Sequence, residues 1–236
     1  TASINGLTPQ ASNMQPHNMI INGAMTVAQR GTSKTATSPT TYLVDRFKAY
    51  SGDYVNYPYT ISQSTDGPYG FANSLKYNFD GVDAAPSAEH SFWQPIEGQN
   101  LQHLKKGTPD AESITLSFWC KSSVAGTYIA ELMDADNSRH INKAYTINSA
   151  NTWEYKAITF AGDTTGSLGN DNGASLFPTF WLSANSSNTS GTLQTSWGAL
   201  NQGNRAVGQT NLAATLNNAF YITGVQLEAG STASPF

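Results

Sequence analysis

One segment, residues 113–122, restricts the fold more than any other part of the 236-residue sequence. It reads S-I-T-L-S-F-W-C-K-S, and its residues alternate between two sets. One set is Ile114, Leu116, Phe118 and Cys120, and the other is Thr115, Ser117, Trp119 and Lys121. A period of two predicts a half-buried β-strand, whose apolar face must be covered by a second layer. Because the chain has many short alternating segments and no long helical pattern, we expect an all-β sandwich of two antiparallel sheets.

Further strands are predicted wherever short apolar runs lie between Gly, Asn, Asp or Ser turns. They cover residues 57–63, 73–79, 90–96, 127–134, 140–147, 152–160, 176–183 and 220–228, with a shorter one ending near Tyr50 and another starting at Ile20. In the last segment the apolar parity changes at Thr223-Gly224, which predicts a β-bulge in a strand at the middle of a sheet. Residues 98–107 predict a short helical turn that Gly107 stops, with Lys105-Lys106 as its solvated end.

The charge content excludes several functional classes. Charged residues make up 12% of the chain, against about 25% in ordinary soluble proteins. The net charge of −4 argues against nucleic acid as a partner, because phosphate binding needs clustered Lys and Arg. No apolar run is long enough to span a membrane, and the first 29 residues lack the basic start of a secretory signal. We therefore expect neither a membrane partner nor routing through a membrane.

The sequence predicts one domain with an N-terminal arm. Residues 1–17 carry scattered apolar side chains without a period, so they cannot form a core of their own. We predict that this segment is an extended arm that docks on a neighbouring protein through Ile4, Leu7 and Met14. Residues 18–236 then form the sandwich domain. The alternative for the arm is a frayed terminus.

No pattern of catalytic or metal-ligating residues stands out. The four histidines lack a spacing that would place two ligands on one face; they are His17, His90, His103 and His140. Cys120 lies on the inward parity of its strand, where it would act as a small hydrophobe. The acidic side chains that could pair in a glycosidase also fit turns and exposed strand faces; they are Glu97, Asp110, Glu112, Glu131, Asp134 and Asp136. We predict no catalytic residue, no metal and no cofactor.

Two groups of charged or polar residues have competing interpretations. Asp and Asn residues at 134–137, 163 and 170–172 could offer oxygen ligands to Ca²⁺, but no EF-hand loop is present and turn formation explains them better. Arg30 and Asp45-Arg46 are rare charges in this chain, and we interpret them as a structural ion pair rather than as catalytic groups.

Aromatic residues are the remaining candidates for function. Trp119 has the outward parity on the central strand, and four other tryptophans lie on or near other strands; they are Trp93, Trp153, Trp181 and Trp197. An outward Trp can stack on a sugar ring or anchor a contact with another subunit. The alternative is a Trp covered by the loops of its own domain. Trp119 therefore joins Ile4, Leu7 and Met14 as a candidate for a partner interface.

Several segments of the chain resemble structural proteins of tailed bacteriophages. They are N-M-I-I-N-G-A-M-T-V-A-Q-R-G-T-S, Y-L-V-D-R-F, I-E-G-Q-N-L, S-I-T-L-S-F-W-C-K-S-S-V-A-G-T-Y, N-T-W-E-Y-K-A-I-T-F-A-G-D-T-T-G and F-Y-I-T-G-V-Q-L-E-A-G-S-T-A-S-P-F, between Asn18 and Phe236. The resemblance implies a jelly-roll sandwich of the galactose-binding or carbohydrate-binding-module type, used on a virion. It supplies no catalytic residue.

Three functions follow as hypotheses. The first is a non-enzymatic capsid decoration or cement protein on the capsid exterior, a homotrimer whose uncharged arm and loops staple the major capsid protein or other virion proteins. The second is a tail-associated module that binds a host surface glycan. The third is a glycan hydrolase, which would need a pair of facing carboxylates.

Overall fold

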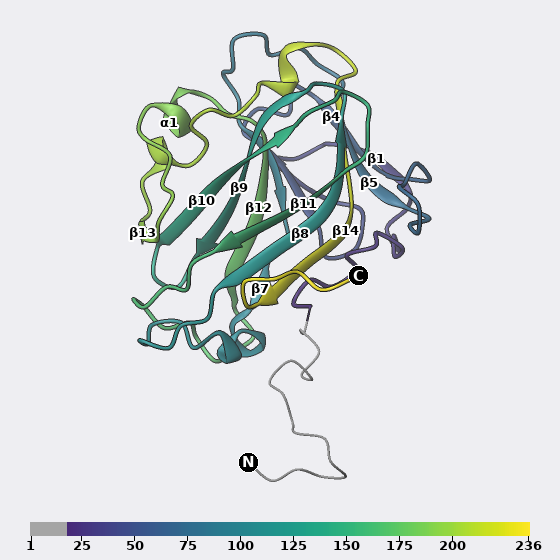
Figure 1. Cartoon of the computed structure of the whole chain (residues 1–236). Coiled ribbons are helices and arrows are strands. Elements are labelled where there is room, and N and C mark those ends of the chain that lie inside the picture. Colours follow the sequence, from purple (N-terminus) through teal and green to yellow (C-terminus); the bar gives the residue numbers. More distant parts are fainter. Residues whose placement is uncertain (1–17) are drawn as a thin grey trace.

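The structure is a computed structural model that describes residues 18–236, and their strands form two antiparallel sheets packed face to face (Figure 1). The six-stranded sheet has the order β1 (Ser33–Thr35), β4 (Tyr59–Ser64), β5 (Ser74–Phe79), β14 (Ala219–Ala229), β8 (Ile114–Ser122) and β11 (Glu154–Phe160). The eight-stranded sheet has the order β13 (Gly198–Ala199), β10 (Arg139–Ile147), β9 (Gly126–Asp134), β12 (Ala174–Ser183), β6 (His90–Trp93), β3 (Lys48–Ser51) and β2 (Thr40–Tyr42), and β7 (Ile96–Glu97) pairs with β12.

The connections between the sheets are those of a jelly roll. Strands β5, β14, β8 and β11 lie side by side in one sheet, and β6, β12, β9 and β10 lie side by side in the other. Along the chain, β5, β8, β11 and β14 alternate with strands of the opposite sheet, and β9 to β10 is a hairpin within one sheet. Two facing four-stranded sheets connected in this way define the fold. The sequence prediction of a jelly-roll sandwich is confirmed.

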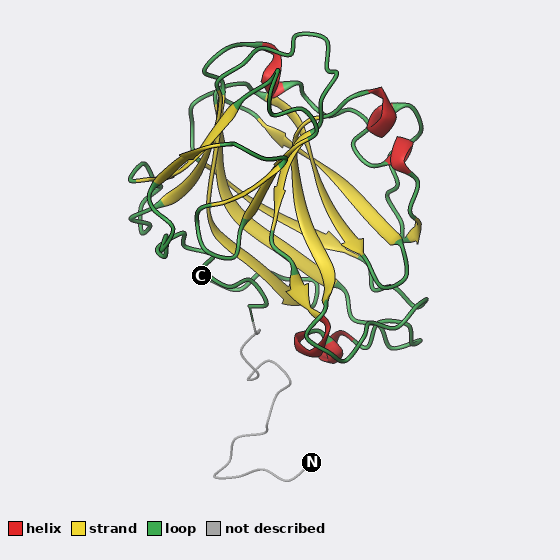
Figure 2. Ribbon diagram, turned by 180° about the vertical axis from the view of Figure 1, so that it is seen from behind, coloured by secondary structure: helices red, strands yellow, loops and turns green. Residues whose placement is uncertain are grey.

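Helices in the described residues are short and lie in the loops that connect the strands (Figure 2). They are η2 (Gly98–Asn100), η3 (Gln102–Leu104), α1 (Ser186–Thr189), η4 (Gln202–Asn204) and η5 (Leu212–Ala214). The turn predicted at 98–107 therefore exists as two 3₁₀ segments. Gly107 has a φ of +84°, a left-handed conformation that glycine adopts without strain.

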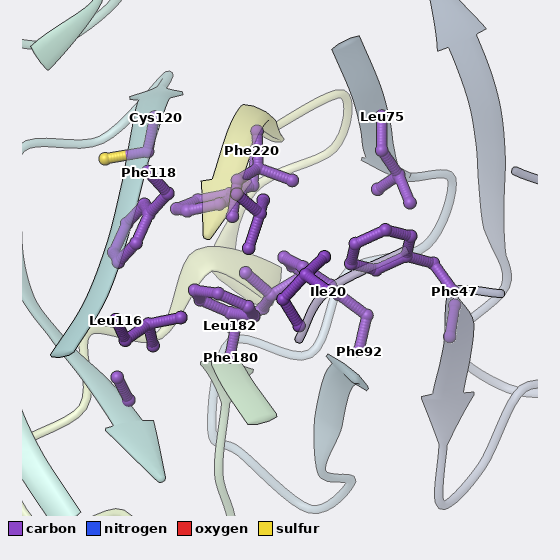
Figure 3. Close-up of a cluster of buried hydrophobic side chains, with 14 of the residues drawn as sticks. Ile20, Phe47, Leu75, Phe92, Leu116, Phe118, Cys120, Phe180, Leu182 and Phe220 are labelled. Atoms are coloured by element: carbon purple, nitrogen blue, oxygen red, sulfur yellow. The ribbon is translucent and has the colours of Figure 1, made fainter. Parts of the chain in front are cut away.

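Aromatic side chains fill the space between the sheets (Figure 3). The rings of Phe92 and Phe180 stack with centroids 4.9 Å apart, and Phe118 meets Phe180 edge-on at 5.0 Å. Leu116, Phe118 and Cys120 of β8 are completely buried, as their parity predicts. Each such buried side chain stabilises the fold by about 1.5–3 kcal/mol. Burial also raises the pKa of the Cys120 thiol to about 12, so this side chain is a hydrophobe and not a nucleophile.

Strand β14 lies in the middle of its sheet, between β5 and β8, and contains the predicted bulge. The register to β8 shifts between Thr223 and Gln226, so that the apolar residues on both sides of the shift face the core; they are Phe220, Ile222, Val225 and Leu227. Gly224 has a φ of +61°, and a Cβ on it would lie 2.6 Å from the Phe71 ring. The extra residue therefore requires glycine.

The chain from Asn18 runs beside the second half of β14. The Met19 amide donates to the Leu227 carbonyl at 2.9 Å, and the Asn18 side chain accepts from the Leu227 amide at 3.0 Å. The strand predicted to start at Ile20 is wrong. The Asn18 side chain also accepts from the Ile20 amide at 2.9 Å, so the chain bends into a turn in place of an extended strand. The predicted arm, residues 1–17 with Ile4, Leu7 and Met14, lies outside the described residues.

Across residues 18–236, none of the helices has the length and apolar character that a membrane span requires.

His90 makes the stability of the core dependent on pH. Its ring is fully buried, and Nδ1 lies 2.8 Å from the Tyr77 hydroxyl. Burial lowers the pKa of His90 from 6.5 to about 4, against a smaller opposing effect of Asp83 and Asp53. Between pH 6.5 and pH 4, His90 is mostly protonated in the unfolded chain and mostly neutral in the folded chain. The free energy of unfolding therefore falls as the pH decreases from 6.5 to 4.

We predict that His90 contributes about 3 kcal/mol to the loss of stability between pH 7 and pH 4. Urea unfolding at a series of pH values should show a steeper loss for the native sequence than for His90→Phe. NMR titration of the folded protein provides a second measurement if the variant does not fold. A His90 ring that titrates near pH 6.5 in the folded state would contradict the prediction.

Candidate functional site

A row of side chains crosses the outer side of the eight-stranded sheet. Strand pairing places Lys48 of β3 opposite Trp93 of β6, Trp93 opposite Thr179 of β12, and Thr179 opposite Glu131 of β9. On β6, Phe92 faces the core, so Trp93 projects outward on the alternate parity. We call this side of the sheet, with Tyr42, Tyr50, Trp93 and Trp181, the aromatic face.

Two half-buried rings form the centre of the aromatic face. The centroids of Tyr50 and Trp93 are 5.8 Å apart, with 47° between the ring planes. Both rings line a central hollow of about 270 Å³. Its other walls are Glu89, Ser91, Met133, Phe177, Thr179, Trp181 and Arg205. Aromatic rings beside a few polar groups are the usual lining of a site for a small organic ligand.

A buried ion pair fixes one wall of the central hollow. Arg205 Nε and Nη2 donate to the two oxygens of Glu131 at 2.9 and 2.8 Å, and Trp181 Nε1 donates to the same carboxylate at 3.1 Å. The guanidinium carbon lies 5.0 Å from the Trp181 ring centroid. His140 Nδ1 lies 3.2 Å from Glu131 as well. Burial alone would raise the pKa of Glu131, but the hydrogen bond from His140 and the charge of Arg205 hold the pKa below its ordinary value.

A second, lateral hollow of about 420 Å³ continues toward β2. It is lined by Gln29, Arg30, Tyr42, Asp45, Arg46, Pro95, Glu97, Asn172 and Ala174. The Lys48 ammonium lies between the two hollows, 5.5 Å from the Tyr42 centroid and 5.7 Å from the Trp93 centroid. Arg30 pairs with Asp45 at 3.5 Å, which confirms the structural ion pair predicted from the sequence. Arg46 pairs with Glu97 at 2.7 Å.

Trp119 projects from the opposite side of the molecule. It is half-buried on the outer side of the six-stranded sheet, as its parity predicts, and its ring lies 5.5 Å from that of Tyr155. Both line a hollow of about 600 Å³ with Phe71, Gln226 and Phe236 among the other residues. The structure therefore does not bring Trp119 into the aromatic face. Its role in a partner interface stays a prediction, as do those of Ile4, Leu7 and Met14.

The sequence places Trp93 and Trp181 on or near strands but does not show that they belong to one site. The short segment H-S-F-W carries the signal for Trp93, because Phe92 and Trp93 must face opposite sides. Tyr50 and Arg205 were missed. Tyr50 pairs with Ser91 across β3 and β6, and Arg205 comes from a loop far along the chain. The spacing of residues along the sequence does not reveal either of these contacts.

Two of the acidic residues named as possible Ca²⁺ ligands, Asp134 and Asp163, contact a lysine instead. Lys106 Nζ lies 2.5 Å from Asp134 and 3.1 Å from Asp163, and it donates to the carbonyls of Thr165 and Gly166 at 3.1 and 2.7 Å. The prediction of a solvated helix end is therefore wrong for Lys106. Its ammonium is buried because loops from distant parts of the chain close around it. Among the described residues, no group of three or more His, Cys, Asp or Glu side chains could hold a metal ion.

No protein-family model matches the chain. No curated protein matches it significantly either. Solved structures with a similar arrangement include a bacteriophage CBA120 tailspike protein 4 domain, described as enzymatically active, at 13% identity and a TM-score of 0.43. The match covers 90% of this chain and 21% of that one, so the chain spans about a fifth of the tailspike domain.

Two further similar structures are carbohydrate-binding modules. A family 11 module from Clostridium thermocellum, in complex with a mixed-linked tetrasaccharide, is 13% identical with a TM-score of 0.41 over 84% of this chain and 96% of that one. The CBM22-1 xylan-binding domain from Paenibacillus barcinonensis Xyn10C is 11% identical, with a TM-score of 0.38 over 85% and 94%.

The buried Lys106 gives a prediction for stability. In a Lys106→Met variant, the fully buried Asp134 carboxylate loses the cation that pairs with it, while Asp163 keeps its pair with Arg139. We expect the free energy of unfolding to fall by about 3–5 kcal/mol. Urea unfolding at pH 7 measures the change. Lys105→Met is the matched control, because its exposed ammonium pairs with Glu112 at the surface and its loss should have a much smaller effect. Equal effects of the two substitutions would contradict the assignment.

Proposed function

We propose that the protein binds a glycan on the aromatic face and does not turn it over. The observation that carries the proposal is the pair of half-buried rings, Tyr50 and Trp93, beside the polar walls of the central hollow. The apolar face of a sugar ring stacks on an aromatic side chain, and its hydroxyls pair with neighbouring hydroxyl, carboxylate and guanidinium groups. Ser91, Thr179 and Glu89 supply such groups around the two rings.

The pair Glu131 and Arg205 supports this proposal by holding the site in shape. Binding affinity increases when the receptor groups are already fixed in the bound arrangement, because less conformational entropy is lost. Arg205 makes two hydrogen bonds to a buried carboxylate and lies over the Trp181 ring, so its position does not depend on a ligand. The wall of the hollow is thereby preorganised.

The same contacts favour binding over hydrolysis. A glycosidase needs one carboxyl group as an acid and a second as a base or nucleophile. Both oxygens of Glu131 already accept hydrogen bonds from Arg205, and the carboxylate is fully buried. It is therefore not available to a substrate. Glu89 is the carboxylate that lines the central hollow, and Glu131 lies behind Arg205 outside the lining.

We place this binding on the tail of a virion, as a module that recognises a host surface glycan. The support is the resemblance of the chain's segments to phage structural proteins, together with the aromatic face. Capsid decoration by a homotrimer, the first hypothesis from the sequence, depends on the arm at residues 1–17. That segment lies outside the described residues, whereas the aromatic face lies within them. The tail-associated alternative is therefore the one we propose.

We predict that the full chain binds specific members of a glycan array and that Trp93→Ala weakens this binding at least about tenfold, or about 1.4 kcal/mol. Isothermal titration calorimetry with the best glycan from the array measures the loss. Trp119→Ala is the matched control, because it removes a half-buried Trp from the opposite side of the sandwich. We expect its affinity to equal that of the native sequence, and we expect no new reducing ends on long incubation.

Two outcomes would overturn the proposal. Loss of binding in Trp119→Ala with full binding in Trp93→Ala would assign the site to the six-stranded sheet. The absence of any glycan ligand from a broad array would reject glycan binding.

A further inference from the structure

The charges around the aromatic face are almost all neutralised within the protein. Three arginines lie beside the hollows, and each is paired with a carboxylate. The pairs are Arg30 with Asp45, Arg46 with Glu97, and Arg205 with Glu131. Lys48 differs from them, because it forms no ion pair with any carboxylate of residues 18–236. One unneutralised positive charge therefore lies in the row of side chains that crosses the face.

Aromatic contacts hold this charge in place without neutralising it. Strand pairing sets Lys48 between Tyr42 of β2 and Trp93 of β6, and its ammonium lies 5.5 and 5.7 Å from their ring centroids. A cation over an aromatic ring is attracted by the negative face of the ring. A ring has no lone pair that satisfies an N–H donor. The ammonium thus keeps donors for an anionic oxygen that reaches the face.

The opposite end of the central hollow carries the complementary charge. Glu89 lines this end beside Tyr50. Burial raises the pKa of the Tyr50 phenol, and the neighbouring Glu89 carboxylate raises this pKa further. The three arginine–carboxylate pairs are each neutral overall. The remaining charges are the positive charge of Lys48 near Trp93 and the negative charge of Glu89 near Tyr50. A ligand with an acidic group on one side would bind in a single orientation.

We infer that the glycan recognised on the aromatic face is acidic, with a sugar ring on Trp93 and its carboxylate, sulfate or phosphate at Lys48. This inference rests on the proposed glycan-binding function and adds its ligand class. A charged hydrogen bond contributes about 1.5–3 kcal/mol. Loss of the ammonium should therefore weaken binding of the acidic glycan by about tenfold or more.

The test compares ligands that differ only in their acidic group. Oligogalacturonate and its carboxyl-reduced neutral counterpart are titrated against the full chain, together with sialylated, sulfated and neutral members of the array. We expect acidic members to bind best and to bind less tightly as salt increases, since the screening length is about 8 Å at 0.15 M. Lys48→Met should lose about tenfold in affinity for the acidic members and little for the neutral ones. Lys48→Arg should retain most of the affinity.

Lys34→Met is the matched control, because it removes the same charge from β1 of the other sheet. It should leave the affinity unchanged. The inference would be overturned if the array ligands were mainly neutral, or if Lys48→Met bound acidic ligands as tightly as the native sequence does. Glycan binding on the aromatic face would still stand in that case, provided that Trp93→Ala weakens it. If no glycan binds at all, the proposed function fails and this inference fails with it.

Discussion

The packing of aromatic rings between the two sheets is the interaction on which the rest of the structure depends. Phe92, Phe118 and Phe180 interlock across the sandwich, and the strands that carry them can satisfy this contact in one register only. A shift of one residue on β6 would exchange Phe92 with Trp93 and place the outer ring inside. The core thus determines which side chains project outward. The side chains at the alternate positions of these strands point away from the core, and some of them form the aromatic face.

The strands could be predicted from the sequence because their signal is local. The alternation in β8, the parity change at Gly224 and the strands from β9 to β12 appear in the structure near their predicted bounds. The start of the described chain was harder, because the hydrogen bonds of Asn18 to β14 connect residues at opposite ends of the sequence. Local propensity cannot anticipate a contact of that kind.

The candidate site was less predictable than the fold, for the same physical reason. Outward parity applies equally to Trp93 and Trp119, and sequence gives no means to decide which has suitable neighbours. Trp93 has such neighbours because the strand order places Tyr50 beside it and because a loop brings Arg205 over the same sheet. Adjacent lysines with the same local context, Lys105 and Lys106, likewise have opposite environments. In each case the environment of the side chain depends on contacts between segments that are far apart in the sequence.

The oxygen cage around Lys106 has a wider consequence. Two carboxylates and two carbonyls gathered around one point could have been joined by an ion from solution, and their hold on the loops would then vary with the free concentration of that ion. Here the cation is covalently part of the chain and cannot diffuse away. The attachment of these loops therefore does not require a dissolved divalent ion.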